Sequence, residues 1–344
     1  MSPMGIRVSP LGLTLFCLIA VGVIYHLYSG VISSRLAAFG QTKKVDLRNL
    51  AAVSVEAAVL GGREVKRIRE EDSLKEQSKG KTKEGANELL TMGDLLSHRK
   101  MYNLLKNTYP DLTVYSEEHD NEVDKDITWS NNVPFDIRAN IELGHEVPAD
   151  SVTVWIDPLD ATQEYTENLI KYVTTMVCVA VDGKPVIGVV HQPFTGFTAW
   201  AIVGMGSNVH PRSSYNIHQP NVIVSRSHSG EVKNYIQNAF GANTTVTPAG
   251  GAGYKVLSLL NMPSNEVNSV DQADVYVHIT FIKKWDICAG AALLAALGGQ
   301  LTTLKGDAID YSGTALNKEG LVASVGLDHR AIVSKLPVWD PEKH

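Results

Sequence analysis

The hexapeptide DPLDAT at residues 157–162 carries the residue types best suited to chemistry in this chain. Two carboxylates three residues apart on a tight turn, Asp157 and Asp160, can bridge hard divalent cations, and the Leu159 carbonyl offers a further oxygen ligand. Thr162 stands where a helix would start, so it could cap that helix or orient a water. Asp, Pro and Thr also form ordinary strand-to-helix turns, so the hexapeptide alone leaves a metal site and a plain turn open.

Three further carboxylates lie at or near the ends of predicted elements. Asp94 lies in a predicted helix, Glu117 ends a predicted strand, and Asp286 opens a very apolar helix. The positive end of the helix dipole also favours a carboxylate at Asp286, so an N-cap role is the alternative there. With Asp157 and Asp160, these residues could build two or three adjacent magnesium sites, because magnesium prefers carboxylates and substrate phosphate to cysteine or histidine.

Three motifs together resemble one family of enzymes: an acidic pair at 117–118, WIDPLDATQEY at 155–165 and WDICAG at 285–290. They are similar to motifs of the lithium-sensitive, magnesium-dependent phosphomonoesterases, which include inositol monophosphatases, inositol polyphosphate 1-phosphatases and bisphosphate nucleotidases. The resemblance covers roughly residues 48–335. Ala161 departs from the commoner pattern, in which Gly or Ser precedes the threonine.

A narrower resemblance is to the members of that family that act on 3′-phosphoadenosine 5′-phosphate (PAP) in the Golgi. It rests on the apolar N-terminus and on three segments: SRSHSG at 225–230, PAGGAGYK at 248–255 and IKKWDICAG at 282–290. It implies a 3′-nucleotidase that converts PAP to AMP and phosphate and so supports sulfation. An inositol phosphate phosphatase on the same scaffold is the alternative. A catalytically silent membrane interaction protein is the third hypothesis, and the intact set of carboxylates argues against it.

The resemblance also implies a role for each candidate residue. Asp94 and Thr162 would activate the attacking water, while bound Mg²⁺ lowers the pKa of water and neutralises charge on the phosphoryl group. Lithium would inhibit, and a homodimer is the assembly that the family suggests. The implied metal ligands are Asp94, Glu117, Asp157, the Leu159 carbonyl, Asp160 and Asp286. The implied substrate-binding residues are Ser225, His228, Gly251 and Lys255.

The pattern of elements predicts an α+β half, residues 48–204, followed by an α/β half, residues 205–344. In the first half a helix is expected across 86–105. Pro158 is expected to end the strand formed by residues 151–157. The charge-dense residues 63–84 are interpreted as a solvated helix end and loop. Neighbouring strands favour an antiparallel or mixed sheet, and the resemblance implies the layered α/β sandwich of the inositol monophosphatase and fructose-1,6-bisphosphatase type. The other expected strands are 113–115, 151–157, 172–181, 185–191, 197–203, 222–225 and 275–279.

Composition narrows the possible partners. The 31 basic residues are outnumbered by 37 acidic ones, giving a net charge of −6, which does not favour binding of a nucleic acid polymer. Three cysteines, Cys17, Cys178 and Cys288, cannot make a disulfide framework and lack the spacing of metal ligands.

The N-terminal residues 11–29 contain no charged side chain. As a helix they would span roughly 28 Å, close to the hydrocarbon thickness of a bilayer. We interpret them as an uncleaved signal anchor, because the run exceeds the ~7–15 apolar residues of a cleaved signal peptide. Residues 1–10 would then be a cytoplasmic tail and 30–47 a stem.

The charges that flank the apolar run do not decide its orientation. The resemblance implies a single-pass type II protein of the Golgi membrane with its catalytic portion in the lumen. A sequon at Asn243 is compatible with that location, although a chance tripeptide explains it equally well.

Overall fold

The structure is a computed structural model that describes residues 9–10, 12, 14–25, 43–81, 87–120, 122–226, 229–263 and 270–339. The chain divides into two units, Met1–Lys43 and Lys44–His344. In the first unit residues 14–25 are helical, with exposed apolar side chains. Across the described ranges, no helix is both long enough and apolar enough to span a membrane. Leu11, Leu13 and residues 26–29 of the predicted anchor lie outside the described residues.

A six-stranded sheet in the order β10-β9-β8-β7-β6-β4 organises the first half of the second unit. Strands β6 to β10 pair antiparallel with their neighbours, and β4 joins β6 in parallel. The mixed sheet expected from the sequence is therefore confirmed. Its strands are β4 Thr113–Ser116, β6 Val152–Asp160, β7 Thr174–Val181, β8 Lys184–His191, β9 Thr198–Ile202 and β10 Gly206–Ser207.

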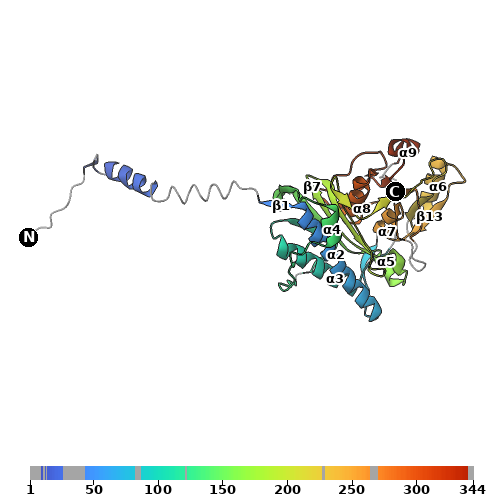
Figure 1. The fold of residues 1–344 in the computed structure, drawn as a ribbon, viewed down its shortest axis with the longest axis horizontal. Helices are drawn as coiled ribbons and strands as arrows, with labels where there is room; N and C mark the ends of the chain where they lie inside the picture. The colour runs from blue at the N-terminus through green and yellow to red at the C-terminus, as the bar shows by residue number, and fades with distance from the viewer. Residues whose placement is uncertain are drawn as a thin grey trace, which may run out of the picture. The chain divides into compact units, whose positions relative to one another are not determined.

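Alternating side chains send the two faces of this sheet into separate cores. Val154 and Val177 pack toward helices α2 and α3, whereas Trp155 and Cys178 pack toward α7 and α8. Figure 1 shows α2 and α3 side by side on one side of the strands and α8 on the other. The longer helices are α2 Leu47–Glu70, α3 Met92–Thr108, α6 Ser229–Phe240 and α8 Lys284–Ala296; the shorter ones are α4 Phe135–Asn140, α5 Thr162–Thr166, α7 Ala252–Leu257 and α9 His329–Lys335.

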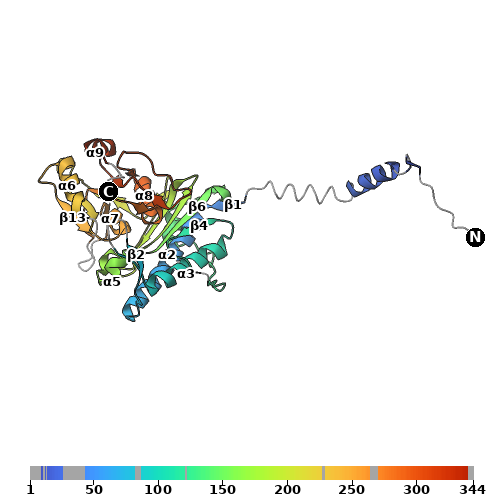
Figure 2. The same ribbon diagram turned by 180° about the vertical axis from the view of Figure 1, so that it is seen from behind.

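A five-stranded sheet in the order β13-β12-β15-β19-β17 lies beyond α8. Tyr276 and Ala323 face α8, while Val224 and Val277 pack against α6 and α9. Helices, sheet, helix, sheet and helices therefore follow one another, which confirms the predicted layered α/β sandwich and can be followed from behind in Figure 2. The strands are β12 Val222–Ser225, β13 Val246–Ala249, β15 Val275–His278, β17 Gln300–Thr302 and β19 Leu321–Ser324.

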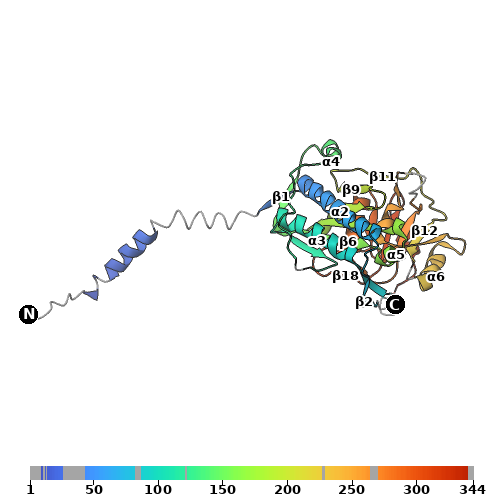
Figure 3. The ribbon, with the colours of Figure 1, turned by 90° about the horizontal axis from the view of Figure 1, so that it is seen from below.

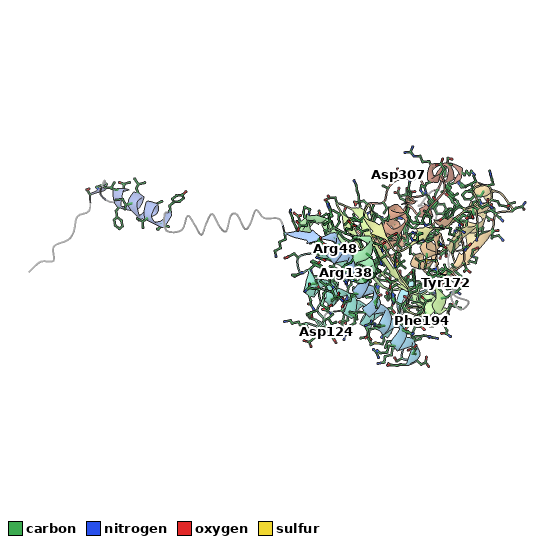
Figure 4. All side chains as sticks on the ribbon, in the orientation of Figure 1. Arg48, Asp124, Arg138, Tyr172, Phe194 and Asp307 are labelled. Atoms are coloured by element: carbon green, nitrogen blue, oxygen red, sulfur yellow. A yellow bond between two sulfur atoms is a disulfide. The ribbon has the colours of Figure 1, made fainter. Side chains whose placement is uncertain are left out.

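Short strand pairs and turns complete the unit. Arg48, labelled in Figure 4, donates from Nη1 to the Glu142 carbonyl at 3.0 Å and so ties the start of α2 to the loop before β5. Figure 3 shows α2 and α3 from below, with β1 near the beginning of α2. The pairs are β1 Lys44–Asp46 with β5 Glu146–Pro148, β2 Gln77–Lys81 with β3 Asn87–Leu90, β11 His210–Pro211 with β14 Leu260–Asn261, and β16 Ile282–Lys283 with β18 Leu316–Asn317. Two 3₁₀ turns cover Ala149–Ser151 and Ile170–Tyr172.

Two local predictions are wrong. The helix expected across 86–105 begins only at Met92, because the Thr91 side chain accepts from the backbone at Gly93 and Asp94 and caps it there. The residues before that cap form β3. Pro158 does not end its strand either: β6 continues to Asp160 through an irregularity in its pairing with β7, and a proline is tolerated where the ladder is interrupted.

The cysteines form one disulfide bond, which the sequence did not predict and which is compatible with the absence of a disulfide framework. Cys178 of β7 and Cys288 of α8 form a disulfide bond, so the chain holds one bridge and no larger framework among the described residues. The two cysteines are 110 residues apart, and only the packing of α8 on the first sheet brings them together.

Candidate active site

Three predicted ligands converge at one edge of the first sheet. Each of Glu117, Asp157 and Asp286 offers a carboxylate oxygen, and these oxygens all lie within 4.8 Å of one another. Ser116 pairs with Ile156 in the parallel β4–β6 ladder, so the residues that follow them, Glu117 and Asp157, are neighbours. Asp286 arrives from the first turn of α8, where its carboxylate accepts from the Lys283 backbone amide at 3.0 Å.

The cluster brings together one buried carboxyl group, that of Asp157, and two partly buried ones. Burial, followed by the charges of the neighbouring carboxylates, raises the pKa of Asp157 and of Asp286 well above the usual range. Burial also raises the pKa of Glu117 to about 7. The site therefore requires either bound protons or a cation to compensate the charge.

Lys79 of β2 is a residue of this site that the sequence analysis missed. Its ammonium lies 3.0 Å from Glu117 Oε1 and also contacts Glu118, and it opposes the rise in the pKa of Glu117. Every residue of β2 is exposed, as the interpretation of residues 63–84 as solvated expects, but that interpretation did not include the ion pairs of Lys79, whose side chain is 28% exposed. Nothing in the alternating charges around it distinguishes this lysine from the others.

The donor set suits Mg²⁺, which prefers carboxylate and carbonyl oxygens. A second observation agrees with a bound group here. The Tyr276 hydroxyl is fully buried and has no hydrogen-bond partner among the residues that the structure describes. The pKa of Tyr276 is raised well above its ordinary value, first by burial and then by the charges of Asp160 and Asp286. An unpartnered polar atom within electrostatic reach of Asp160 and Asp286 fits a site that takes up water together with a cation.

Asp94 and Thr162 come together as the resemblance implies. Thr162 Oγ1 lies 3.1 Å from Asp94 Oδ1 and 3.1 Å from the Leu159 carbonyl. The other oxygen of Asp94 accepts from the Thr91 amide at 2.7 Å and the Thr91 hydroxyl at 2.6 Å, which fixes the carboxylate. Both neighbours of the Thr162 hydroxyl are acceptors, so its oxygen keeps lone pairs that can accept a proton from water. Burial raises the pKa of Asp94 to about 6.

Asp160 lies apart from the three-carboxylate group. Its oxygens accept from the amides of Ala252 and Gly253, at 3.0 and 2.8 Å, and from the Thr174 hydroxyl at 3.0 Å. Gly251 has a φ of +61°, and a Cβ there would lie 2.9 Å from Asp160 Oδ2. Glycine is thus required for the approach of this turn to Asp160, whatever it does for a substrate. A metal-binding role for Asp160 stays a prediction.

The structure describes three of the four residues predicted to bind substrate. Ser225 ends β12 and is half-buried, while His228 lies outside the described residues. Lys255 is buried: its ammonium lies 3.3 Å from the Ala249 carbonyl and 5.5 Å from the centre of the Tyr276 ring. Burial lowers the pKa of Lys255, and the negative charge of Asp160 opposes that shift.

Two further contacts involve residues next in sequence to those predicted to bind substrate: the ion pairs of Arg226 and the packing of Tyr172 on Tyr254. Arg226 was not singled out from the sequence, yet its Nε lies 3.1 Å from Glu164 Oε1 and it also pairs with Glu167. Tyr172, labelled in Figure 4, packs edge-on against Tyr254 of α7 with ring centres 4.8 Å apart. Both contacts are long-range, and the sequence carries no local signal for them.

The predicted glycosylation site, Asn243, is exposed between α6 and β13.

A layered sandwich with carboxylates gathered at the edge of its first sheet is the arrangement that the motifs implied. The model of the Inositol monophosphatase family matches residues 46–337. The chain therefore belongs to the inositol monophosphatase family.

Individual relatives extend the likeness over the whole chain. It is 64% identical to Inositol monophosphatase 3 of Danio rerio, covering 100% of both chains. It is 54% identical to the Golgi-resident adenosine 3′,5′-bisphosphate 3′-phosphatase of Homo sapiens, again covering 100% of both.

Solved structures agree in fold. The extragenic suppressor protein suhB from Bartonella henselae matches with a TM-score of 0.60 at 17% identity, over 82% of this chain and 96% of that one. CysQ from Bacteroides thetaiotaomicron matches with a TM-score of 0.57 at 19% identity, over 82% and 98%.

The raised pKa values predict how pH acts on the metal-free protein. Since Glu117 and Asp157 hold protons in the folded state that they release in the unfolded chain, they stabilise the fold at low pH. This stabilisation is lost as pH rises through about 7 for Glu117, and as pH rises well above the usual carboxyl range for Asp157. In EDTA, the Asp157→Asn variant should therefore become increasingly more stable than the wild type as pH rises from 5 to 8. Thermal melts of both proteins across this range measure the difference in Tm.

The difference in Tm is the proper readout because buried His98 and His191 act in the opposite sense. Burial lowers the pKa of each to about 4, so they favour the fold as pH rises toward 6.5, equally in both proteins. Mg²⁺ at pH 8 should raise the Tm of the wild type and leave that of Asp157→Asn nearly unchanged. A difference in Tm that does not grow with pH would show that these carboxylates do not repel one another in the folded state.

Proposed function

We propose that the protein is a Mg²⁺-dependent phosphomonoesterase that hydrolyses the 3′-phosphate of PAP, releasing AMP and phosphate. The observation that carries the proposal is the Thr162–Asp94 hydrogen bond of 3.1 Å, in an active site that also gathers three acidic side chains. Glu117, Asp157 and Asp286 would hold Mg²⁺, with Asp94, Asp160 and the Leu159 carbonyl as the further ligands that the resemblance implies. Bound Mg²⁺ supplies charge neutralisation and makes water more acidic.

The chain's own residues would move the proton. Thr162 accepts a proton from the attacking water through a free lone pair of Oγ1 and passes its own proton to Asp94. Asp94, with a pKa of about 6, is mostly ionised at neutral pH and can receive it. The water oxygen then bonds to phosphorus as the bond to the 3′ oxygen breaks in line. The 3′ oxygen takes up a proton to become the hydroxyl of AMP, and no covalent intermediate with the protein is formed.

PAP is proposed because of the relatives named Golgi-resident adenosine 3′,5′-bisphosphate 3′-phosphatase, 54% identical along the full chain in the human case. Ser225, His228, Gly251 and Lys255 are the residues that we propose to bind its adenosine phosphate. The relative named Inositol monophosphatase 3, at 64% identity, favours an inositol phosphate as the second candidate. We also propose that the protein forms a homodimer, the assembly that the family resemblance implies.

We further propose that the protein is anchored in the Golgi membrane as a single-pass type II protein, with residues 11–29 as the anchor. Leu15 and Phe16 of the N-terminal helix are 59% and 70% exposed, so these apolar side chains lack a protein core. The Cys178–Cys288 disulfide is typical of oxidising compartments such as the secretory pathway. The proposed order is a tail at 1–10, the anchor, a stem at 30–47, the metal-binding half at 48–204 and the nucleotide-binding half at 205–344.

Phosphate release from PAP and from inositol monophosphate, measured side by side, tests the activity. We expect Mg²⁺-dependent release from PAP with a higher kcat/KM than from inositol monophosphate, and inhibition by Li⁺. The Asp157→Asn variant, which keeps the shape of the side chain and loses its charge, serves as the inactive control. A preference for inositol monophosphate would select the second candidate, and no release from either substrate would contradict the phosphatase itself.

The Thr162→Ala variant tests the proposed proton route. We expect kcat to fall by about 10²–10⁴-fold with little change in KM, because the hydroxyl acts on the water and not on the substrate. Thr166→Ala, in the same helix but with its hydroxyl bonded to the Gln163 carbonyl, is the matched control. Equal losses in the two variants would show that α5 is merely sensitive to substitution.

Mass spectrometry of the protein from a eukaryotic host tests the topology. We expect an intact N-terminus that retains residues 11–29, together with glycan at Asn243, because the enzyme that adds it acts only on lumenal segments. Treatment with a glycosidase should then shift the protein to its unmodified mass. An N-terminus near residue 30 would contradict the anchor, whatever the state of Asn243.

A further inference from the structure

The disulfide lies beside the metal-binding carboxylates, which the sequence alone does not reveal. Cys178 and Cys288 are at most 1% exposed, and their Cα atoms are 5.6 Å apart. Cys288 lies two residues after Asp286 in the first turns of α8. Across the sheet, Cys178 pairs with Trp155, which lies two residues before Asp157 in β6. The bridge is therefore two residues away from Asp157 along the ladder and two residues away from Asp286 along α8.

The geometry of the ladder directs Trp155, Asp157 and Cys178 to one side of the sheet. Residues that lie directly opposite in an antiparallel pair face the same side of the sheet, and so do residues two apart in one strand. Trp155 and Cys178 both pack in the core that contains α8. Asp157 belongs to the same face, so it points toward the helix that carries Asp286. The bridge is a covalent link between the sheet face that presents Asp157 and the helix that presents Asp286.

The link opposes a force that acts in the metal-free protein. The oxygens of Asp157, Glu117 and Asp286 lie within 4.8 Å of one another, and when these groups lose their protons, as they must to bind a cation, like charges at that separation push the first turn of α8 away from β6. Other contacts also hold this turn. The Lys284 ammonium donates to the Ser312 carbonyl at 2.6 Å, and Gly188 of β8 leaves room for the Ala289 carbonyl. Of these contacts only the disulfide is covalent.

We propose that the Cys178–Cys288 disulfide is a positioning pair for the metal centre, holding Asp286 against Asp157 before the metal binds. The inference rests on the metal-dependent function proposed above. A site assembled in advance binds its ion more tightly, because less ordering and less electrostatic work remain to be done on binding. The cysteines touch neither substrate nor reacting atoms, so opening the bridge weakens the affinity for Mg²⁺ while the chemistry of the loaded site stays the same.

A purely structural disulfide is the rival interpretation, and stability alone does not separate the two. Removing any crosslink destabilises a fold, since the unfolded chain regains freedom. Val277→Ala is a suitable control, because Val277 is fully buried in the core on the far face of the second sheet, against α6 and α9. It lowers stability through a cavity and leaves the surroundings of Asp157 and Asp286 intact.

The first measurement establishes the bridge itself. The full-length protein is denatured without reductant, alkylated and weighed. One free thiol, from Cys17, is expected for the wild type, and two are expected for Cys288→Ala. Three free thiols in the wild type would overturn the proposal.

The second measurement is calorimetric titration of Mg²⁺ into the full-length protein, with Tm recorded in parallel. We expect the dissociation constant of the C178A/C288A variant, and of Cys288→Ala, to rise by ~10-fold or more, as for other changes next to metal ligands. Val277→Ala should lower Tm and leave the constant unchanged. An unchanged constant in folded C178A/C288A overturns the proposal, as does loss of folding in both cysteine variants, since the bridge would then support the whole fold. No substrate is used, so failure of PAP hydrolysis and failure of this inference are separate results.

Discussion

Repulsion among Glu117, Asp157 and Asp286 is the constraint on which the rest of the structure depends. With an effective dielectric constant of ~20, two of these groups would repel by about 3 kcal/mol if both were ionised 4.8 Å apart, a large part of the stability of a typical domain, so the site holds protons until a cation compensates the charge. The fold keeps them together by parallel pairing of β4 with β6, by the backbone amide at the start of α8 and by the packing of that helix. The packing of the layers therefore holds the three carboxyl groups together in an arrangement that a bound cation would stabilise.

Asp94 and Thr162, the pair proposed to activate water, are held in place in a different way. Asp94 uses one oxygen to complete the cap of α3 with Thr91, which leaves the other oxygen for Thr162. Because the Asp94 carboxylate also caps α3, it cannot rotate away from Thr162. Its direction is therefore set by secondary structure. Its pKa of about 6 follows from the same burial, which places the carboxylate near the proton affinity that a base at neutral pH requires.

How far the sequence predicts this site depends on whether a contact is local. Asp157, Glu117 and Asp286 could be placed from the ends of strands and helices, and the layered fold from the order of those elements. Lys79 could not, because its partners lie across the fold and its neighbours in the chain are equally charged. The helix expected over 86–105 overlooked the Thr91 cap, a local signal that the sequence does contain. The disulfide had no signal at all, since nothing in the spacing of three cysteines selects a pair.

The turn at 157–162 joins the two halves of the fold through opposite uses of its carboxylates. Asp157 faces the other acidic side chains, while Asp160 accepts from the first amides of α7, next to the glycine turn. Ala161 takes up a left-handed conformation, with φ of +72°, at the point where the chain reverses. A shift of the glycine turn would therefore reach the proposed metal-binding turn at 157–162 through Asp160.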